Sequence, residues 1–276
     1  MSDSSYTFDS PGADVVLRAP LRPEDPESTE FKDFHVHKLI LSIASTIFND
    51  MFSVPQPTES GANLPVVHVV EPAEPFEIFL RLIYPVDPPT ITSLEIVDHL
   101  SLLAVKYMTS CVRAKLRQIL VTPSSLNNDP VWVYVIACRM ELEEEAKVAI
   151  AHTYRIDLTQ EISDPLLRTM TAETYNRLLR AHATRRGGLI SVVNQVEGPS
   201  YGGARCTCSA WFYTRLSMTI ILGIWEVPIL DRPRLDLCLS KVEGGSGCKN
   251  GSDCRVSARS TSAYFTNILE KIEKLT

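Results

Sequence analysis

The spacing of apolar residues changes at Lys38, and this change constrains the fold more than any other feature of the sequence. Before it, residues 13–18 and 31–37 are short runs rich in β-branched and aromatic side chains. In the second run Phe34 and Val36 fall on one face and the residues between them fall on the other, which predicts a strand. After Lys38, apolar residues recur at helical spacings. The sequence therefore predicts an α+β fold that begins with a small β-sheet.

The elements that follow alternate between helices and one more strand. Proline and cap residues mark where most of them begin, because Ser and Thr cap helices and Pro suits a first turn. The predicted elements up to Pro123 are strands over 13–18 and 31–37, helices from Lys38 and from Ser45, a strand over 66–70, and helices from Pro75, Ser93 and Thr109.

Past Pro123 the pattern is helical only. The predicted helices start at Asp129-Pro130, cover residues 141–156 and 171–196, and lie near residues 210–225 and 260–275. Thr171 is placed to cap the helix over 171–196. We expect a break or weakening at Gly187-Gly188, since each glycine costs roughly 1 kcal/mol inside a helix.

The bulk composition excludes several classes of protein. A hydrophobic fraction of 45% fits a globular chain with a buried core. The net charge of -6 argues against a nucleic-acid partner, which needs a strongly basic surface. The longest apolar stretch, residues 216–230, is too short for a bilayer span and contains Glu226 and Pro228. Residues 1–10 are polar and resemble no export signal, so we expect a cytoplasmic or nuclear protein with mostly reduced cysteines.

No catalytic motif stands out, and we expect that the protein is not an enzyme. The sequence has no nucleophile elbow, phosphate-binding loop, dinucleotide fingerprint or zinc-protease motif. The acidic run at residues 141–145 is typical of a solvated helix face. The same interpretation applies to the basic cluster made of Arg177, Arg180, His182, Arg185 and Arg186.

The first part of the chain resembles the BTB/POZ family. The family pattern is an aspartate on the first strand, a histidine before the first helix, a phenylalanine after a serine, a helix ending in tyrosine, and an alanine–lysine–tyrosine segment. Here these residues are Asp14, His37, Ser45 with Phe48, Tyr84, and Ala104 with Lys106 and Tyr107. All five features occur in this order, so the resemblance covers residues 10–122.

The resemblance implies a BTB/POZ fold that binds other proteins. It also implies that His37 is a buried structural histidine near Asp14, and we expect the two side chains to contact each other because unpaired buried polar groups are costly. His35 should lie on the same side of its strand as His37, but the sequence offers no third metal ligand nearby. Residues 129–196 resemble, more loosely, a helical tail of fungal BTB proteins. We therefore expect a BTB/POZ domain at 10–122, a helical extension at 123–198 and a cysteine-bearing helical region at 199–276.

Two departures from the family narrow the expected function. Family members that recruit a cullin carry a hydrophobic residue, any residue and a glutamate after the second helix, and the nearest match here is Pro57-Thr58-Glu59. Few residues precede Asp14, so dimerisation by an exchanged N-terminal helix is not expected. We expect a scaffold or adaptor, and the alternatives are a substrate adaptor of a cullin-type ubiquitin ligase and a zinc-containing transcriptional regulator.

The cysteines near the C-terminus are the one candidate metal site. Cys206 and Cys208 form one close pair, and Cys248 and Cys254 form another, with four glycines around the second pair. Four thiolates suit tetrahedral zinc, and all-cysteine ligation leaves no open position, which indicates a structural ion. The spacing lacks the tight pairs of zinc knuckles, so ordinary free thiols are the alternative.

Overall fold

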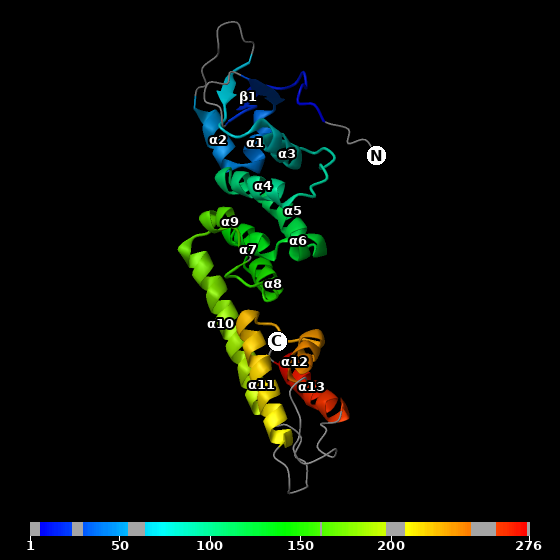
Figure 1. Ribbon diagram of the computed structural model, residues 1–276. Helices are drawn as coiled ribbons and strands as arrows, with labels where there is room; N and C mark the ends of the chain where they lie inside the picture. Colours follow the sequence, from blue (N-terminus) through cyan, green and yellow to red (C-terminus); the bar gives the residue numbers. More distant parts are fainter. Residues whose placement is uncertain are drawn as a thin grey trace. The chain divides into compact units, whose positions relative to one another are not determined.

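A computed structural model describes residues 6–23, 30–54, 64–160, 162–196, 208–243 and 258–274. The chain divides into two compact units, Met1–Ala149 and Ile150–Thr276. Figure 1 shows the elements of both units. Each unit is described by itself below.

The first unit contains a three-stranded sheet and a group of helices. Its strands are β1 (Val15–Pro20), β2 (Phe31–Val36) and β3 (Val66–His68). Its helices are α1 (Lys38–Ala44), α2 (Thr46–Ser53), α3 (Ala73–Ile83), α4 (Leu94–Lys106), α5 (Ser110–Leu120), α6 (Pro123–Asn128), α7 (Pro130–Arg139) and most of α8 (Glu143–Thr153). This is the small sheet followed by helices that the change of spacing at Lys38 predicts.

The sheet has the order β2-β1-β3 and is mixed. Strand β1 runs antiparallel to β2, with Val15 opposite Val36, and parallel to β3, with Val16 opposite Val66. The central strand β1 is mostly buried, as expected for a strand paired on both edges. In β2 only Phe34 and Val36 are buried, which confirms the predicted alternation.

The helices cover the sheet with aromatic side chains. Phe76 and Phe79 of α3 are fully buried, and the ring of Phe76 lies 5.8 Å from that of Phe34 on β2. Phe79 also contacts Tyr107, at the end of α4, with ring centroids 5.6 Å apart. Burying an aromatic side chain of this size contributes roughly 1.5–3 kcal/mol. This core fixes α1 to α4 as a frame beside the sheet.

Helices α6 and α7 follow the residues at which we expect the domain to end. The short helix α6 was not expected; it begins where the Thr122 hydroxyl accepts the Ser125 N–H. Asp129 caps α7 as predicted, with its carboxylate accepting the Trp132 N–H at 2.9 Å. Both helices group with the sheet in the first unit, and the extension that we expect from residue 123 stays a prediction.

The second unit is helical in its described residues. Its helices are α9 (Asp164–Thr169), α10 (Ala172–Gln195), α11 (Cys208–Glu226), α12 (Arg232–Glu243) and α13 (Ala258–Glu273). Helix α10 runs beside α11 (Figure 1). None of the helices in the described ranges is long and apolar enough to span a bilayer.

Helix α10 is continuous, so the predicted break at Gly187-Gly188 is wrong. The reason is packing on its C-terminal side, where Leu189, Val192 and Val193 are buried in the core of the second unit. Burial of three such side chains offsets the roughly 1 kcal/mol that each glycine costs.

Helix α12 was not expected, although the sequence contains a local signal for it. The Asp231 carboxylate accepts the Arg234 N–H at 3.1 Å, as a helix cap does. Leu235, Cys238 and Val242 follow at helical spacings and are buried against α11 and α13. The predicted helices near 210–225 and 260–275 are confirmed by α11 and α13.

Candidate protein-interaction surface

The first turn of α1 is held in place by Asp14 and Tyr84. The Asp14 carboxylate accepts the backbone N–H of Lys38, the first residue of α1, at 2.8 Å. The backbone N–H of His37 donates to the Tyr84 hydroxyl at 2.7 Å. Two N–H groups that a helix leaves unpaired at its start are therefore satisfied by the residue before β1 and by the residue after α3. Burial raises the pKa of Tyr84 to about 12, so this hydroxyl stays protonated.

The hydrogen bonds of Asp14 and His37 go to different groups at the start of α1, and a contact between the two side chains stays a prediction. The His37 ring Nδ1 lies 3.2 Å from the Tyr84 hydroxyl. His37 is half-buried, and a Cβ added at Gly12 would lie 3.5 Å from its Nε2. The two residues thus act separately on the same end of α1, and the sequence pattern did not show Tyr84 as their shared neighbour.

Ser45 fixes the junction between α1 and α2 to α4. Its hydroxyl accepts the Phe48 N–H at 3.0 Å, the predicted cap, and donates to the Tyr107 carbonyl at 2.5 Å. The rings of Phe48 and Tyr107 stack with centroids 4.5 Å apart and planes 7° from parallel. The serine, phenylalanine and tyrosine of the sequence pattern therefore meet in one buried contact.

Glu71 is a buried partner of Lys106 and Tyr107 that the sequence pattern did not reveal. It is buried after β3, where its carboxylate accepts hydrogen bonds from the Tyr107 hydroxyl at 3.0 Å and from the Lys106 ammonium. Burial and the Glu71 charge raise the pKa of Tyr107 well above its usual range. Lys106 and Tyr107 thus fix the end of α4 to the segment after β3.

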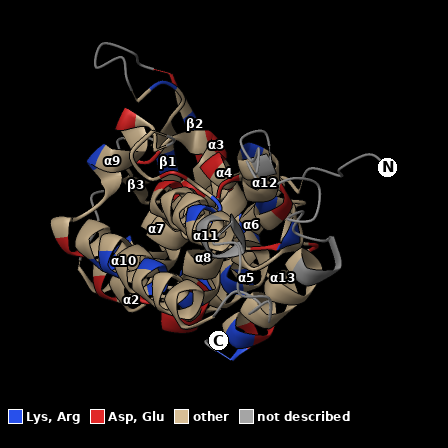
Figure 2. Ribbon diagram, turned by 60° about the horizontal axis from the view of Figure 1, so that its bottom comes forward, with Lys and Arg blue, Asp and Glu red and all other residues tan. Residues whose placement is uncertain are grey.

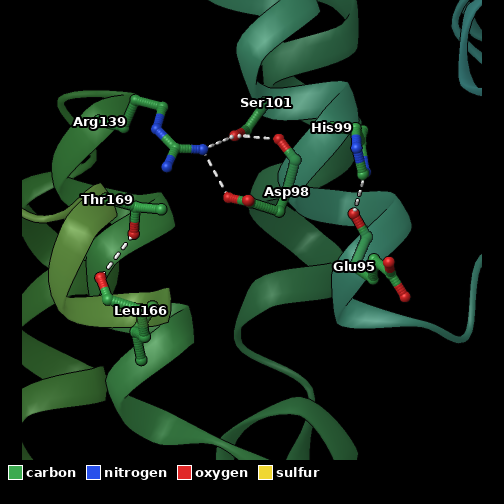
Figure 3. Close-up of polar contacts among 7 residues, drawn as sticks. All are labelled: Glu95, Asp98, His99, Ser101, Arg139, Leu166 and Thr169. Carbon is green, nitrogen blue, oxygen red and sulfur yellow. Dashed lines mark hydrogen bonds and ion pairs between the residues drawn. The ribbon is translucent and has the colours of Figure 1, made fainter. Parts of the chain in front are cut away.

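A contact from α7 holds the middle of α4. Figure 3 shows the Arg139 guanidinium donating to the Asp98 carboxylate and to the Ser101 hydroxyl, the second at 3.0 Å. The Ser101 hydroxyl in turn donates to the Asp98 carbonyl at 2.7 Å. Both carboxylate and guanidinium are largely buried, and such charge-assisted bonds are stronger than neutral ones.

On this rigid frame, several large apolar side chains are exposed. Leu39 and Ile43 of α1 are 71% and 79% exposed, one helical turn apart. Met108 follows α4, and its sulfur lies 3.8 Å from the Thr46 hydroxyl at the start of α2. We use the name α1–α4 surface for five exposed apolar residues of these elements, which are Leu39, Ile43, Leu102, Val105 and Met108. Exposed apolar groups supported by a fixed backbone are typical of protein-binding sites.

Met108 has an unusual backbone conformation. Its φ is +51°, in the left-handed region, just after α4 ends at the Tyr107 cap. Glycine normally takes this position because other residues pay about 1 kcal/mol or more there. Glu141 occupies the equivalent position after α7 with φ +56°. At Met108 this backbone conformation belongs to a large apolar residue of the α1–α4 surface. The local sequence does not predict the positive φ.

The remaining candidate metal ligands are two histidines on or beside β2 and the cysteines near the C-terminus. His35 is exposed on β2, and within the described ranges no three His, Cys, Asp or Glu side chains are placed to hold a metal ion. Cys206, Cys248 and Cys254 lie outside the described residues, as does the side chain of Cys208. Zinc and free thiols therefore both stay open for these four cysteines, and metal analysis of the purified chain would decide between them.

The basic cluster on α10 is not the solvated face that we expected. His182 is buried, with its Nε2 2.9 Å from the Thr153 hydroxyl. The Arg185 guanidinium lies over the Tyr154 ring at 5.8 Å, and that of Arg186 lies over the Trp225 ring at 5.0 Å. Burial lowers the pKa of His182 to about 4, and the positive charge of Arg186 acts in the same direction.

Comparison with known families agrees with this geometry. The family model of the BTB/POZ domain matches residues 28–124, a range that covers β2, β3 and α1 to α5. The chain therefore contains a BTB/POZ domain, a protein–protein interaction module, within an α+β fold that continues into a helical region. No curated protein matches the chain.

Proposed function

We propose that this protein is a scaffold or adaptor without catalytic activity, and that the α1–α4 surface of its BTB/POZ domain binds a partner protein. The carrying observation is that Leu39 and Ile43 are exposed on a helix whose start, end and neighbours are each fixed by hydrogen bonds. A surface held in its binding conformation loses little entropy on association. Apolar anchors in the middle of an interface supply most of the binding energy.

Quantitative affinity capture tests the proposal. The tagged chain is compared with Ile43→Asp, which puts a charge on the most exposed of the five apolar residues, and with Val148→Asp, which changes an exposed valine on α8. We expect one or more proteins to bind the unmodified chain and the α8 variant but to lose about tenfold or more in recovery with Ile43→Asp. If no bound protein responds to Ile43→Asp, the α1–α4 surface is not the binding site.

The same experiment separates a scaffold from a ubiquitin-ligase adaptor. Stoichiometric recovery of a cullin with the unmodified chain would contradict the simple scaffold and favour the adaptor. Residues 57–59, which carry the weak cullin signature, lie outside the described residues. A cytoplasmic or nuclear setting belongs to the same proposal, and the thiols of Cys111 and Cys238, which form no disulfide, agree with it.

The variant Met108→Gly offers a sharper test, because we expect it to stabilise the fold and to weaken partner binding. Met108→Gly should raise the free energy of unfolding by about 1 kcal/mol, since glycine adopts positive φ without strain. The same change removes an apolar anchor and should weaken partner binding. Glu141→Gly is the matched control, because it relieves the same strain outside the α1–α4 surface. Equal partner binding by all three chains would contradict a role for Met108.

A further inference from the structure

The exposed side of α11 carries an apolar stripe that the BTB/POZ domain does not account for. Met218, Leu222 and Trp225 are 65%, 66% and 58% exposed, at spacings of four and three residues that place them on one face. The opposite face, with Leu216, Ile220 and Ile224, is fully buried in the core of the second unit. In Figure 2 most of α11 is drawn in the colour of uncharged residues.

Neighbouring helices hold this stripe in a defined position. The Arg186 guanidinium of α10 covers one face of the Trp225 ring at 5.0 Å, which fixes a large side chain that is otherwise exposed. The Ser217 and Tyr264 hydroxyls are 2.8 Å apart and join α11 to α13. A fixed tryptophan on a buried scaffold is the kind of side chain that anchors protein interfaces.

The two charged residues of α11 are placed so that this helix can pair with the same helix of a second copy. Arg215 and Glu226 are the two charged residues of this helix, and both are exposed at opposite ends of the stripe. In an antiparallel pair of α11 helices centred near Ile221, Arg215 of each copy comes close to Glu226 of the other. The same register brings Met218 of each copy against Trp225 of the other. Glu226 is also the last residue of α11, where a negative charge is unfavourable unless a cation is near.

We propose that the stripe on α11 binds the same stripe on a second copy of this chain, antiparallel about a two-fold axis near Ile221. Such an isologous contact buries the three apolar side chains of each copy and forms two equivalent ion pairs. The stripe is short, so we expect a weak dimer rather than an obligate one. The α1–α4 surface plays no part in this contact, and either proposal can fail without the other.

Charge reversal in the full-length chain tests the antiparallel arrangement. Arg215→Glu alone places two pairs of like charges in the dimer, and so does Glu226→Arg alone. Each should weaken self-association roughly two- to thirtyfold, because an exposed ion pair is worth about 0.2–1 kcal/mol and two pairs are lost. A mixture of the two variants should associate as well as the unmodified chain, since both pairs in the mixed dimer are again opposite in sign. Capture with two different tags measures the mixed dimer directly.

Two further variants test the apolar part. Leu222→Asp should weaken self-association about a hundredfold or more, because the change occurs twice at the centre of the symmetric contact. Leu237→Asp is the matched control: it changes an exposed leucine on α12, outside the stripe, and should leave self-association unchanged. Sedimentation measures both, and circular dichroism checks that the variants stay folded. The proposal is overturned if the chain is monomeric up to about 100 μM, if Leu222→Asp has no effect, or if mixing the charge variants restores nothing.

Discussion

Asp14, the residue before β1, supplies the acceptor that α1 lacks in its own sequence. His37 stands at the cap position of α1 but makes no side-chain cap hydrogen bond, and the Asp14 carboxylate takes the Lys38 N–H instead. Replacing a cap acceptor costs about 1 kcal/mol. Asp14→Ala should therefore lower the free energy of unfolding by about that amount in urea denaturation. Asp14→Asn keeps an acceptor oxygen and should retain most of the stability; equal losses in both variants would contradict the capping role.

His182 makes the second unit sensitive to pH. The Thr153 hydroxyl donates to the Ile150 carbonyl, so the His182 Nε2–H donates to the Thr153 oxygen. Because burial lowers the His182 pKa from 6.5 to about 4, the unfolded chain binds a proton more readily than the folded chain between these two values. The stabilisation by neutral His182 is therefore complete above pH 6.5 and is lost as the pH falls toward 4.

The size of this effect can be measured by urea unfolding at two pH values. From about pH 7.5 to about pH 5, the His182 contribution to the free energy of unfolding should fall by about 2 kcal/mol. His182→Gln removes the titrating group, so the variant should show a smaller fall over the same range. An identical pH dependence in the variant and the unmodified chain would assign the effect to other groups.

At the scale of single elements, the continuity of α10 can be tested at Gly187. This residue is exposed, and a Cβ added there would meet no atom within 4 Å. Gly187→Ala should thus raise the free energy of unfolding by about 0.5–1 kcal/mol, because alanine favours the helix. Gly187→Pro should lower it by about 3 kcal/mol or more. Thermal denaturation followed by circular dichroism measures both, and a tolerated proline would indicate that α10 is interrupted there in solution.

Elements with a local signal were predictable from the sequence. Ser45, Ser93, Asp129 and Thr171 all accept the backbone hydrogen bonds expected of caps. The alternation in β2 was also readable, because one face of that strand is buried. The continuity of α10 was not, because it depends on a core formed with α11 and α13, which lie far along the chain.

The candidate surface was less predictable than the fold. The spacing of Leu39 and Ile43 indicates a helix, but the sequence does not say that these two side chains are exposed while Leu41 and Phe48 are buried. The strained backbone of Met108 depends on how α4 ends against α2, which no local pattern shows. Tertiary contacts therefore decide which apolar residues can bind a partner.

At the scale of the whole molecule, net charge separates a protein scaffold from a nucleic-acid regulator. The chain has a net charge of -6, and basic and acidic positions are interspersed along the described helices (Figure 2). Two arginines of the main basic cluster, Arg185 and Arg186, lie over aromatic rings of the chain itself. A surface of this kind neutralises few phosphates, and the affinity of a protein for DNA depends on that number.

We therefore expect the full-length chain to show no salt-dependent retention on duplex DNA. In a titration between about 50 and 200 mM salt, a protein with several phosphate contacts loses orders of magnitude in affinity, whereas this chain should give no measurable binding at either end. Arg180→Glu, which removes an exposed positive charge from α10, should then change nothing. A steep salt dependence that Arg180→Glu reduces would instead assign a nucleic-acid contact to α10, and the zinc-containing regulator would become the better interpretation of the C-terminal cysteines.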